Sequence, residues 1–394
     1  MNRFFLFAIL TIAGLFLSAC GGLTNFTCTD PLGCVAIGSG ENLKVATLLT
    51  MSGPDQVYGI DAVRGVEIAI TDKGKLLGHT IELVKADDQC DEKAGEAAAK
   101  QLAADPQIIG VIGATCSSAS IPAAKVLSDA GMVLISPSST APSLTDPKLH
   151  QPGFLRAIYN DKAQGKAVAD FAYNLLGLRR MLTIHDGTPY PKELQQAACD
   201  NFQQLGGACV EQIDLSKSNR QDILRILQAA APLNPDVIYF PVYTEDGIAI
   251  THAVPQAGFT NPALMSSDGL ISNDFIQKTK PNTDGMYLSG PAEVSESATF
   301  TQKYKTRYGE DTIAAYHLQA YDAANMLFNA MQLSAEVVGN KIYLPRQKLR
   351  DALYNTHGLQ GLSTELTCSS DGDCAPPNID IFQIANNDFK EIYP

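Results

Sequence analysis

The sequence predicts an α/β protein with two Rossmann-like lobes, each built around a parallel sheet. Three observations lead to this prediction. Strand-like apolar runs alternate with helical segments of about ten to fifteen residues, which is typical of βαβ units. The alternation runs twice along the chain, with a seam near residues 157–161. A length of 394 residues is sufficient for two domains.

The first half of the chain contains four predicted strands and the helices between them. Val63, Val66 and Ile70 recur at helical spacing, so they predict a helix after the first strand. Asp91 is a good N-cap for the Ala-rich helix that follows it, and another helix is expected over 119–130. The strands predicted here cover residues 43–49, 80–84, 108–112 and 132–135.

The second half repeats the pattern. Asp161 is expected to cap a helix that stops at Gly177. The tail, from Cys368 to residue 384, is expected to form a hairpin. Strands are predicted over residues 181–185, 209–213, 236–240 and 263–265, and helices over 192–205, 220–230, 245–256, 298–308, 316–333 and 346–354.

The first 20 residues resemble an export signal. An apolar run over 4–17 follows Arg3 and is shorter than the about 20 residues that span a bilayer. The run ends in Leu-Ser-Ala-Cys, which looks like a bacterial lipobox, although an ordinary signal peptide is the alternative. We therefore expect residues 1–19 to be removed and Cys20 to carry a lipid anchor. Residues 20–42 are rich in Gly, Thr, Asn and Ser and are predicted to be a tether without regular structure.

The cysteines indicate disulfides. Nine Cys are present, and eight remain if Cys20 is lipidated. An even number in an exported chain favours disulfide bonds, and pairing in sequence order is the economical choice among many. No C-x-x-C motif is present, so a zinc or thioredoxin-like site is not supported. The predicted pairs are Cys28–Cys34, Cys90–Cys116, Cys199–Cys209 and Cys368–Cys374.

Charge and motifs exclude several function classes. The net charge of −13 argues against a protein that binds nucleic-acid phosphates. The sequence has no G-x-S-x-G, no H-E-x-x-H and no P-loop. His185 beside Asp186 is interpreted as structural, and Asp371-Gly372-Asp373 as a turn rather than a calcium loop. We therefore expect no enzyme activity, no cofactor and no metal.

Small polar residues follow several predicted strands, at the edge where open α/β sheets bind ligands. They occupy residues 51–54, 113–118 and 136–142. Ser117 and Thr140 place hydroxyl groups beside helix or turn N-termini, where backbone N–H groups favour an anion. The edge of the first sheet is therefore a candidate ligand site.

These stretches together resemble the type I periplasmic binding proteins, in particular the leucine/isoleucine/valine-binding group of ABC importers. The resemblance covers about residues 43–394 and implies a ligand cleft between two lobes. It also implies the Cys90–Cys116 bond, which the family forms between corresponding stretches. The motifs, in chain order, are LKVATLLTMSGPDQVYG, DDQC, IGATCSS, ISPSSTAPSLT, FLRAIYNDKAQG, IHDGTPY, DVIYFPVY and AYDAA.

The resemblance implies a site for a free amino acid. Ser117 and Thr140 would hold the ligand carboxylate, and Ser138 would offer backbone groups. Asp268 would bind the ammonium group, with Tyr243 nearby. The side-chain pocket would be lined by Tyr58, Tyr190 and Tyr316.

Several positions depart from the family pattern. The family often has Glu where this chain has Asp268, and small apolar residues where it has Ser138 and Ser139. Thr115 likewise replaces a typical aliphatic residue. The pocket is therefore expected to be more polar than one for leucine, and the ligand's identity stays open.

The sequence thus predicts a monomeric, lipid-anchored, extracytoplasmic solute-binding protein that passes a small ligand to an ABC permease. A sensor that presents its closed state to a membrane receptor is the alternative, and a secreted hydrolase is a third reading. Lobe 1 is assigned residues 43–158 plus 291–361, and lobe 2 residues 159–290 plus 362–394. The hinge segments are expected near residues 157–161, 286–291 and 360–364.

Overall fold

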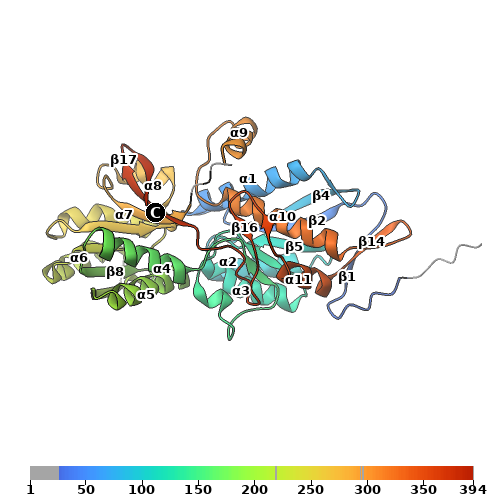
Figure 1. Cartoon of the computed structure of the whole chain (residues 1–394), viewed down its shortest axis with the longest axis horizontal. Helices are drawn as coiled ribbons and strands as arrows, with labels where there is room; N and C mark the ends of the chain where they lie inside the picture. Colours follow the sequence, from blue (N-terminus) through green and yellow to red (C-terminus); the bar gives the residue numbers. More distant parts are fainter. Residues whose placement is uncertain (1–25, 218–219, 293, 295–296, 394) are drawn as a thin grey trace, which may run out of the picture.

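The computed structural model describes residues 26–217, 220–292, 294 and 297–393. Two lobes lie side by side along the long axis of the molecule (Figure 1). The predicted signal segment and Cys20 lie outside the described residues. Within the described residues, no helix is both long and apolar enough to cross a membrane.

The first lobe contains a six-stranded sheet in the order β3-β4-β2-β5-β6-β7, parallel except for β3. Neighbouring residues on a strand point to opposite faces. Val45 therefore packs under α1 and α10, whereas Ala46 packs under α2 and α3. The strands are β2 (Leu43–Leu48), β3 (Lys75–Leu76), β4 (His79–Ala86), β5 (Ile108–Gly113), β6 (Leu134–Ser136) and β7 (Phe154–Arg156). The helices are α1 (Gln56–Lys73), α2 (Glu92–Ala103), α3 (Ser117–Asp129), α9 (Ser297–Tyr308), α10 (His317–Ser334) and α11 (Arg346–Tyr354).

The second lobe contains a seven-stranded sheet in the order β18-β17-β12-β11-β10-β8-β9. It is parallel from β9 to β12, and the β17–β18 hairpin adds two antiparallel strands. The strands are β8 (Arg180–His185), β9 (Ala208–Asp214), β10 (Val237–Tyr239), β11 (Ala263–Ser267), β12 (Tyr287–Pro291), β17 (Ile379–Ala385) and β18 (Asp388–Tyr393). The helices are α4 (Asp161–Asp170), α5 (Pro189–Gln204), α6 (Ile223–Ala230), α7 (Thr244–Ala253) and α8 (Asn273–Thr279).

This architecture confirms the predicted fold class of two α/β lobes with parallel sheets. Asp91 caps α2 as expected, since its carboxylate accepts the N–H groups of Lys93 and Ala94. The cap of α4 was predicted wrongly. Asn160 accepts the N–H of Lys162, and Asp161 is the first helical residue. A π-helical turn (Phe171–Leu175) continues α4.

The predicted tether is shorter than expected. Strand β1 (Cys34–Ile37) pairs with β14 (Lys341–Pro345), which also pairs with β13 (Glu336–Val338). Val35 and Ile37 are buried in the core of lobe 1. The prediction that regular structure starts at Leu43 was therefore wrong, because β1 acquires its strand form from a partner about 300 residues away.

Two of the predicted hinge segments lie in or beside strands. Residues 287–291 form β12 inside the second sheet, and residues 360–364 turn between β15 (Leu359–Gln360) and β16 (Glu365–Leu366). Leu366 and Cys374 pack in the core of the first lobe, although they follow the lobe boundary predicted at residue 362. The tail hairpin is formed by β17 and β18, and the Cys368–Cys374 loop precedes it.

The structure contains all four disulfides predicted from sequence order. They join Cys28–Cys34, Cys90–Cys116, Cys199–Cys209 and Cys368–Cys374. Of these, Cys90–Cys116 ties the loop after β4 to the N-terminus of α3, where the strands of the first sheet end.

Candidate functional site

A small enclosed cavity lies where the carboxyl edges of the two sheets meet. The cavity volume open to the centre of a water molecule is about 10 Å³, so the cavity can hold about one water. The first lobe and the second lobe both contribute walls. The lining residues are Tyr58, Thr115, Cys116, Ser138, Tyr190, Tyr243, Gly269 and Tyr316. Six of the ten ligand-binding residues predicted from sequence therefore line one cavity.

One wall is built to face an anion. Cys116 precedes α3, and the first N–H groups of any helix lack intrahelical acceptors. The Ser117 hydroxyl oxygen accepts the N–H of Ala141 at 3.2 Å, which leaves the hydroxyl proton to donate. Thr140 is fully buried, and its hydroxyl has no hydrogen-bond partner of good geometry among the described residues. These donors lie just behind the lining residues.

Asp88 holds this wall in place. Its buried carboxylate accepts the N–H of Thr115 at 2.8 Å, the N–H of Cys90 at 2.9 Å and the hydroxyl of Thr50. In return the Thr115 hydroxyl oxygen accepts the N–H of Thr50 at 2.9 Å. Burial raises the pKa of Asp88 to about 6. Sequence reasoning missed this role, although Asp88 stands in the DDQC motif.

The two serines before Thr140 serve the loop itself. Ser138 donates to the carbonyl of Thr115 at 2.7 Å while lining the cavity. The Ser139 hydroxyl meets that of Ser120 at 2.8 Å and the carbonyl of Ala114 at 3.1 Å. Ser139 is fully buried and does not line the cavity, so the structure gives it no direct face toward a ligand.

Asp268 is the buried carboxylate of the second lobe, directly after β11. One oxygen accepts from Gln164 Nε2 at 3.0 Å and from the Tyr190 hydroxyl at 2.8 Å. The other accepts from the hydroxyls of Tyr159 at 3.3 Å and Tyr316 at 3.0 Å. Burial raises the pKa of Asp268, and these hydrogen bonds oppose the rise. The carboxylate thus gathers residues from both lobes around the cavity.

Asp161 is a second buried carboxylate that sequence reasoning took for a helix cap. It is fully buried, and neither oxygen has a hydrogen-bond partner of good geometry among the described residues. Its N–H donates to the carbonyl of Thr140 at 3.0 Å, which places it beside the anion-facing wall. Burial, and then the charge of Asp268, raise the pKa of Asp161 well above its usual value. The FLRAIYNDKAQG motif contained this residue, but a cap role masked it.

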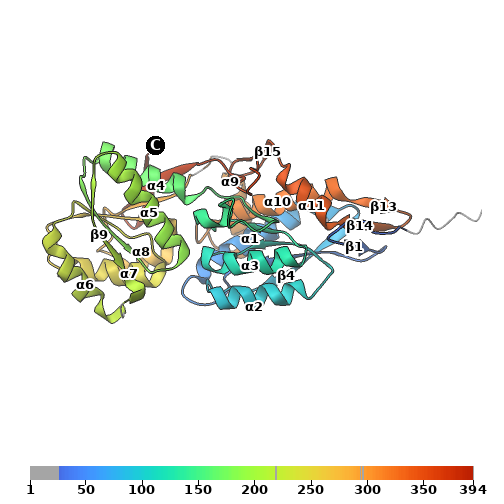
Figure 2. The same ribbon diagram turned by 90° about the horizontal axis from the view of Figure 1, so that it is seen from below.

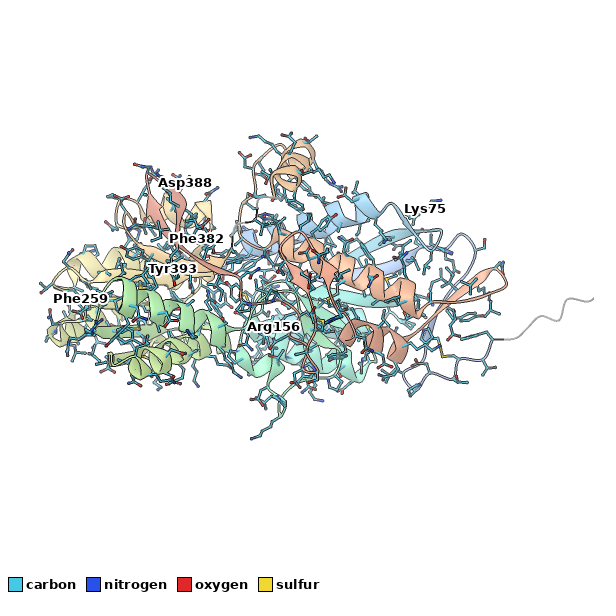
Figure 3. All side chains as sticks on the ribbon, in the orientation of Figure 1. Lys75, Arg156, Phe259, Phe382, Asp388 and Tyr393 are labelled. Carbon is cyan, nitrogen blue, oxygen red and sulfur yellow. A yellow bond between two sulfur atoms is a disulfide. The ribbon has the colours of Figure 1, made fainter. Side chains whose placement is uncertain are left out.

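The charge of Arg156 opposes the rise that burial causes in the pKa of Asp161, but the Arg156 guanidinium forms its hydrogen bonds with other residues. It lies at the junction of the lobes (Figure 3) and is fully buried. Its Nε donates to Asp373 at 2.5 Å, and one amino group donates to the carbonyls of Ser139 and Ala141. The site therefore holds two buried carboxylates, Asp161 and Asp268, with no hydrogen-bonded cation among the described residues.

Direct bonds join the lobes around the cavity. The Tyr58 hydroxyl donates to the carbonyl of Gly269 at 2.7 Å. The N–H of Thr244 donates to Asp55 at 3.2 Å, and the N–H of Ser143 donates to Glu193 at 2.8 Å. The described conformation is therefore closed.

Larger hollows lie elsewhere on the molecule. A groove of about 360 Å³ runs between α8, β17 and the loop before α10, lined in part by His317, Gln319 and Phe382. The carboxylate that lines this groove, Asp388, is exposed, whereas the small cavity is backed by the buried carboxylate of Asp268. Among the described residues, no cluster of His, Cys, Asp or Glu could hold a metal ion. We therefore place the functional site at the small cavity.

Comparison with known proteins identifies the family of this chain. The sequence model of the periplasmic binding proteins matches residues 42–388, which is most of the chain. The chain belongs to the periplasmic binding protein family. The resemblance predicted from the motifs is thereby confirmed. Members of this family bind solutes and are not enzymes, in agreement with the prediction.

Named relatives of this family member include two bacterial proteins. The Leu/Ile/Val-binding protein of Escherichia coli K12 is 29% identical over 267 residues, which is 66% of this chain and 71% of the relative. The amino acid binding protein of Pseudomonas aeruginosa is 30% identical over 226 residues, or 57% of this chain and 59% of the relative.

Solved structures of the family share the fold. The leucine-binding protein LivK of Thermotoga maritima superposes with a TM-score of 0.80 at 24% identity, covering 89% of this chain and 97% of that protein. LivJ of Streptococcus pneumoniae, in complex with isoleucine, gives 0.78 at 19% identity, with coverage of 90% and 100%. A solute-binding protein of R. palustris, in complex with benzoate, gives 0.76 at 19%, with coverage of 90% and 96%.

Proposed function

We propose that this protein is a lipid-anchored, extracytoplasmic solute-binding protein that captures a free amino acid between its lobes and delivers it to an ABC permease. One observation carries the proposal. Two buried carboxylates lie directly behind the lining of one interlobe cavity: Asp268 accepts from the lining residues Tyr190 and Tyr316, and Asp161 adjoins the Thr140 loop. The names of the relatives from E. coli and P. aeruginosa support the ligand class.

The ammonium end of the ligand is assigned to the carboxylates. A buried carboxylate without hydrogen bonds is costly unless a cation or donor reaches it. The unpartnered acceptors Asp161 Oδ1, Asp161 Oδ2 and Gln164 Oε1 belong to successive positions of one face of α4. An ammonium group brings three N–H donors and a positive charge, which meets both needs. Asp268 adds charge from the other lobe.

The carboxylate end is assigned to the wall of lobe 1. A carboxylate that leaves water needs charge-assisted hydrogen bonds. Ser117 and Thr140 supply hydroxyl donors, and the first turn of α3 supplies N–H groups and the positive end of a helix dipole. Ligand orientation then follows from the position of the two walls.

Ligand entry requires the lobes to separate. The closed cavity holds about one water, which is too little for any amino acid. Tyr58 and Tyr316 of lobe 1 donate to Gly269 and Asp268 of lobe 2, so opening breaks these contacts and exposes both walls to solvent. Closure around the ligand would then restore the surface that docks on the permease.

A thermal-shift and calorimetric screen of the mature protein tests this function. The probes are the common amino acids, short amides and aromatic carboxylates such as benzoate. We expect an amino acid to bind, and a ligand at 100 times its Kd stabilises the fold by about 2.7 kcal/mol. Binding of benzoate alone, with no response to any amino acid, would contradict the proposal.

A further inference from the structure

Two exposed apolar side chains stand at one end of lobe 1. Leu333 near the end of α10 is 69% exposed, and Val337 on β13 is 68% exposed. These are the two highest values among the large hydrophobic residues of the described chain. We refer to Leu333 and Val337 as the apolar ledge. Single exposed apolar residues need no explanation, but these two are the most exposed of their kind and lie four positions apart, on consecutive elements of the chain.

Val337 of the apolar ledge continues a buried face of a small sheet out into solvent. Val337 lies directly opposite Ile342 in the β13–β14 pair, and Ile342 lies opposite Ile37 in the β1–β14 pair. Residues directly opposite each other share one face of a sheet. Ile37 and Ile342 are buried in the core of lobe 1, whereas Val337 continues the same face at the free edge.

The N-terminal segment is fastened to this same end. The Phe26 ring stacks on Tyr343 of β14 with centroids 3.9 Å apart, and the carboxylate of Asp30 accepts the N–H of Gln347 at the start of α11. The Cys28–Cys34 disulfide joins this segment to the first residue of β1. Figures 1 and 2 both place β13, β14 and the start of the described chain at the end farthest from lobe 2.

The chain before Phe26 is too short to separate this end from a lipid on Cys20. Five residues, 21–25, stand between them. An extended chain spans at most about 3.5 Å per residue, so Phe26 stays within about 20 Å of the lipidated sulfur. The length of the chain outside the described residues therefore keeps this end of lobe 1 within about 20 Å of the membrane that would hold the anchor.

The charges around the ledge fit an anionic surface. Lys73 Nζ bonds to the side-chain oxygen of Gln332, the neighbour of Leu333, and Lys341 follows the β13–β14 turn. Neither lysine forms an ion pair among the described residues, in contrast to Lys348, which pairs with Glu336. Lysines beside apolar side chains can keep their ammonium groups at lipid phosphates while the apolar groups enter the interface.

We propose that Leu333 and Val337 insert into the headgroup region of the bilayer that carries the lipid anchor, with Lys73 and Lys341 at the lipid phosphates. The proposal rests on the anchor at Cys20 that belongs to the proposed function. The contact would fix the orientation of the anchored protein relative to the bilayer, and therefore the direction in which its cleft opens.

Tryptophan fluorescence tests this contact cleanly, because the chain contains no Trp. Leu333→Trp and Val337→Trp are each placed in the full lipidated protein on vesicles of phosphatidylcholine and phosphatidylglycerol. We expect blue-shifted emission that brominated lipids quench. Leu175→Trp is the matched control, because Leu175 is 51% exposed but belongs to lobe 2, and its emission should be unchanged.

Flotation of the same vesicles separates the possible failures. Protein that floats with the vesicles while all three variants stay unquenched overturns the ledge and leaves the anchor intact. Protein that does not float overturns the anchor and the ledge together, and amino-acid binding measured in solution is independent of both. A blue shift without quenching, which also appears in vesicle-free protein at high concentration, would mean that the ledge contacts a second copy, and the proposal would be wrong.

Discussion

Asp161 is a buried carboxylate to which we assign the ammonium group of the ligand, and its burial should lower the stability of the ligand-free fold. The sequence places it at the start of a helix, where an acidic residue is common, so a cap role was the natural prediction. Asn160 takes that role, and the buried carboxylate oxygens of Asp161 have no hydrogen-bond partner of good geometry among the described residues. Only the meeting of α4 with the Thr140 loop creates this environment, and no local pattern encodes it.

The Asp161→Asn substitution should separate these two effects. Charge-assisted hydrogen bonds contribute about 1.5–3 kcal/mol, so the affinity for an amino acid should fall by about 10- to 100-fold. The ligand-free protein should become more stable, because an uncompensated buried charge is removed. Calorimetry and thermal melting measure the two quantities. Asp129→Asn, at an exposed position of α3, is the control and should change neither.

The pKa shifts predict how ligand binding depends on pH. The raised pKa of Asp161 and Asp268 means that acid protonates them first, and a neutral carboxyl group attracts an ammonium weakly. The melting-temperature gain from an amino acid should therefore shrink as the pH falls. A gain that is constant from acidic to alkaline pH would rule out this pair as the ammonium site.

In the ligand-free protein, a raised carboxyl pKa makes the folding stability fall as the pH rises, whereas ligand binding should strengthen as the pH rises. A carboxyl group whose folded pKa is raised stabilises the fold below its unfolded pKa and loses that contribution as the pH rises through the folded value. For Asp88 the loss falls between about 3.8 and about 6. Its stabilising share should thus be present below pH 4 and absent above pH 6, which denaturant titrations of wild type and Asp88→Ala can compare.

At the scale of elements, amphipathic helices and buried strands were predictable, and elements that depend on a distant partner were not. Helix α11 was predicted with its observed bounds, since its apolar residues recur at helical spacing. Strand β1 and the β15–β16 turn were missed, because each is short and gains its form from pairing. The glycine- and serine-rich loops predicted the sheet edge at which the cavity lies, but not that Ser138 lines the cavity while Ser139 does not.

The disulfides allow a comparison between two elements. In the chain-entropy model, Cys90–Cys116 stabilises by about 3.5 kcal/mol and Cys28–Cys34 by about 2.4 kcal/mol. Replacing each pair by Ala should lower the free energy of unfolding in that order. Only the Cys90 and Cys116 replacements should also weaken ligand binding, because that bond adjoins Thr115. Equal binding losses for both pairs would contradict the assignment of this wall.

At the scale of the whole molecule, we propose that lobe 1 extends through Cys374 and that the chain crosses between the lobes at residues 157–160, after β12 and after Cys374. The repeated βαβ pattern predicted two lobes. It could not predict which lobe holds the tail, because the Cys368–Cys374 loop packs on a strand far away in sequence. The closed arrangement likewise depends on single contacts such as Tyr58 with Gly269.

Tyr58→Phe should shift the molecule toward an open state. It removes one interlobe hydrogen bond of about 1 kcal/mol, which changes the ratio of closed to open molecules by about fivefold. Small-angle scattering of the ligand-free protein should show a larger radius of gyration, and saturating ligand should restore the compact value. Tyr173→Phe, on the surface of lobe 2, should leave the radius unchanged.

The central claim is that the cleft recognises both charged ends of a zwitterion. The most direct test is calorimetry of the best amino acid and of its deaminated analogue, with wild type and with Asp268→Asn. Wild type should prefer the amino acid strongly. Asp268→Asn should lose most of the preference for the amino acid over its deaminated analogue. A third probe, the decarboxylated amine, tests the other end of the ligand. Asp268→Asn should still bind the amino acid better than this amine, because Ser117 and Thr140 remain. If Asp268→Asn and Asp161→Asn both leave the preference for the amino acid over its deaminated analogue unchanged, the ligand's ammonium does not lie at these carboxylates. The account of the site is then wrong.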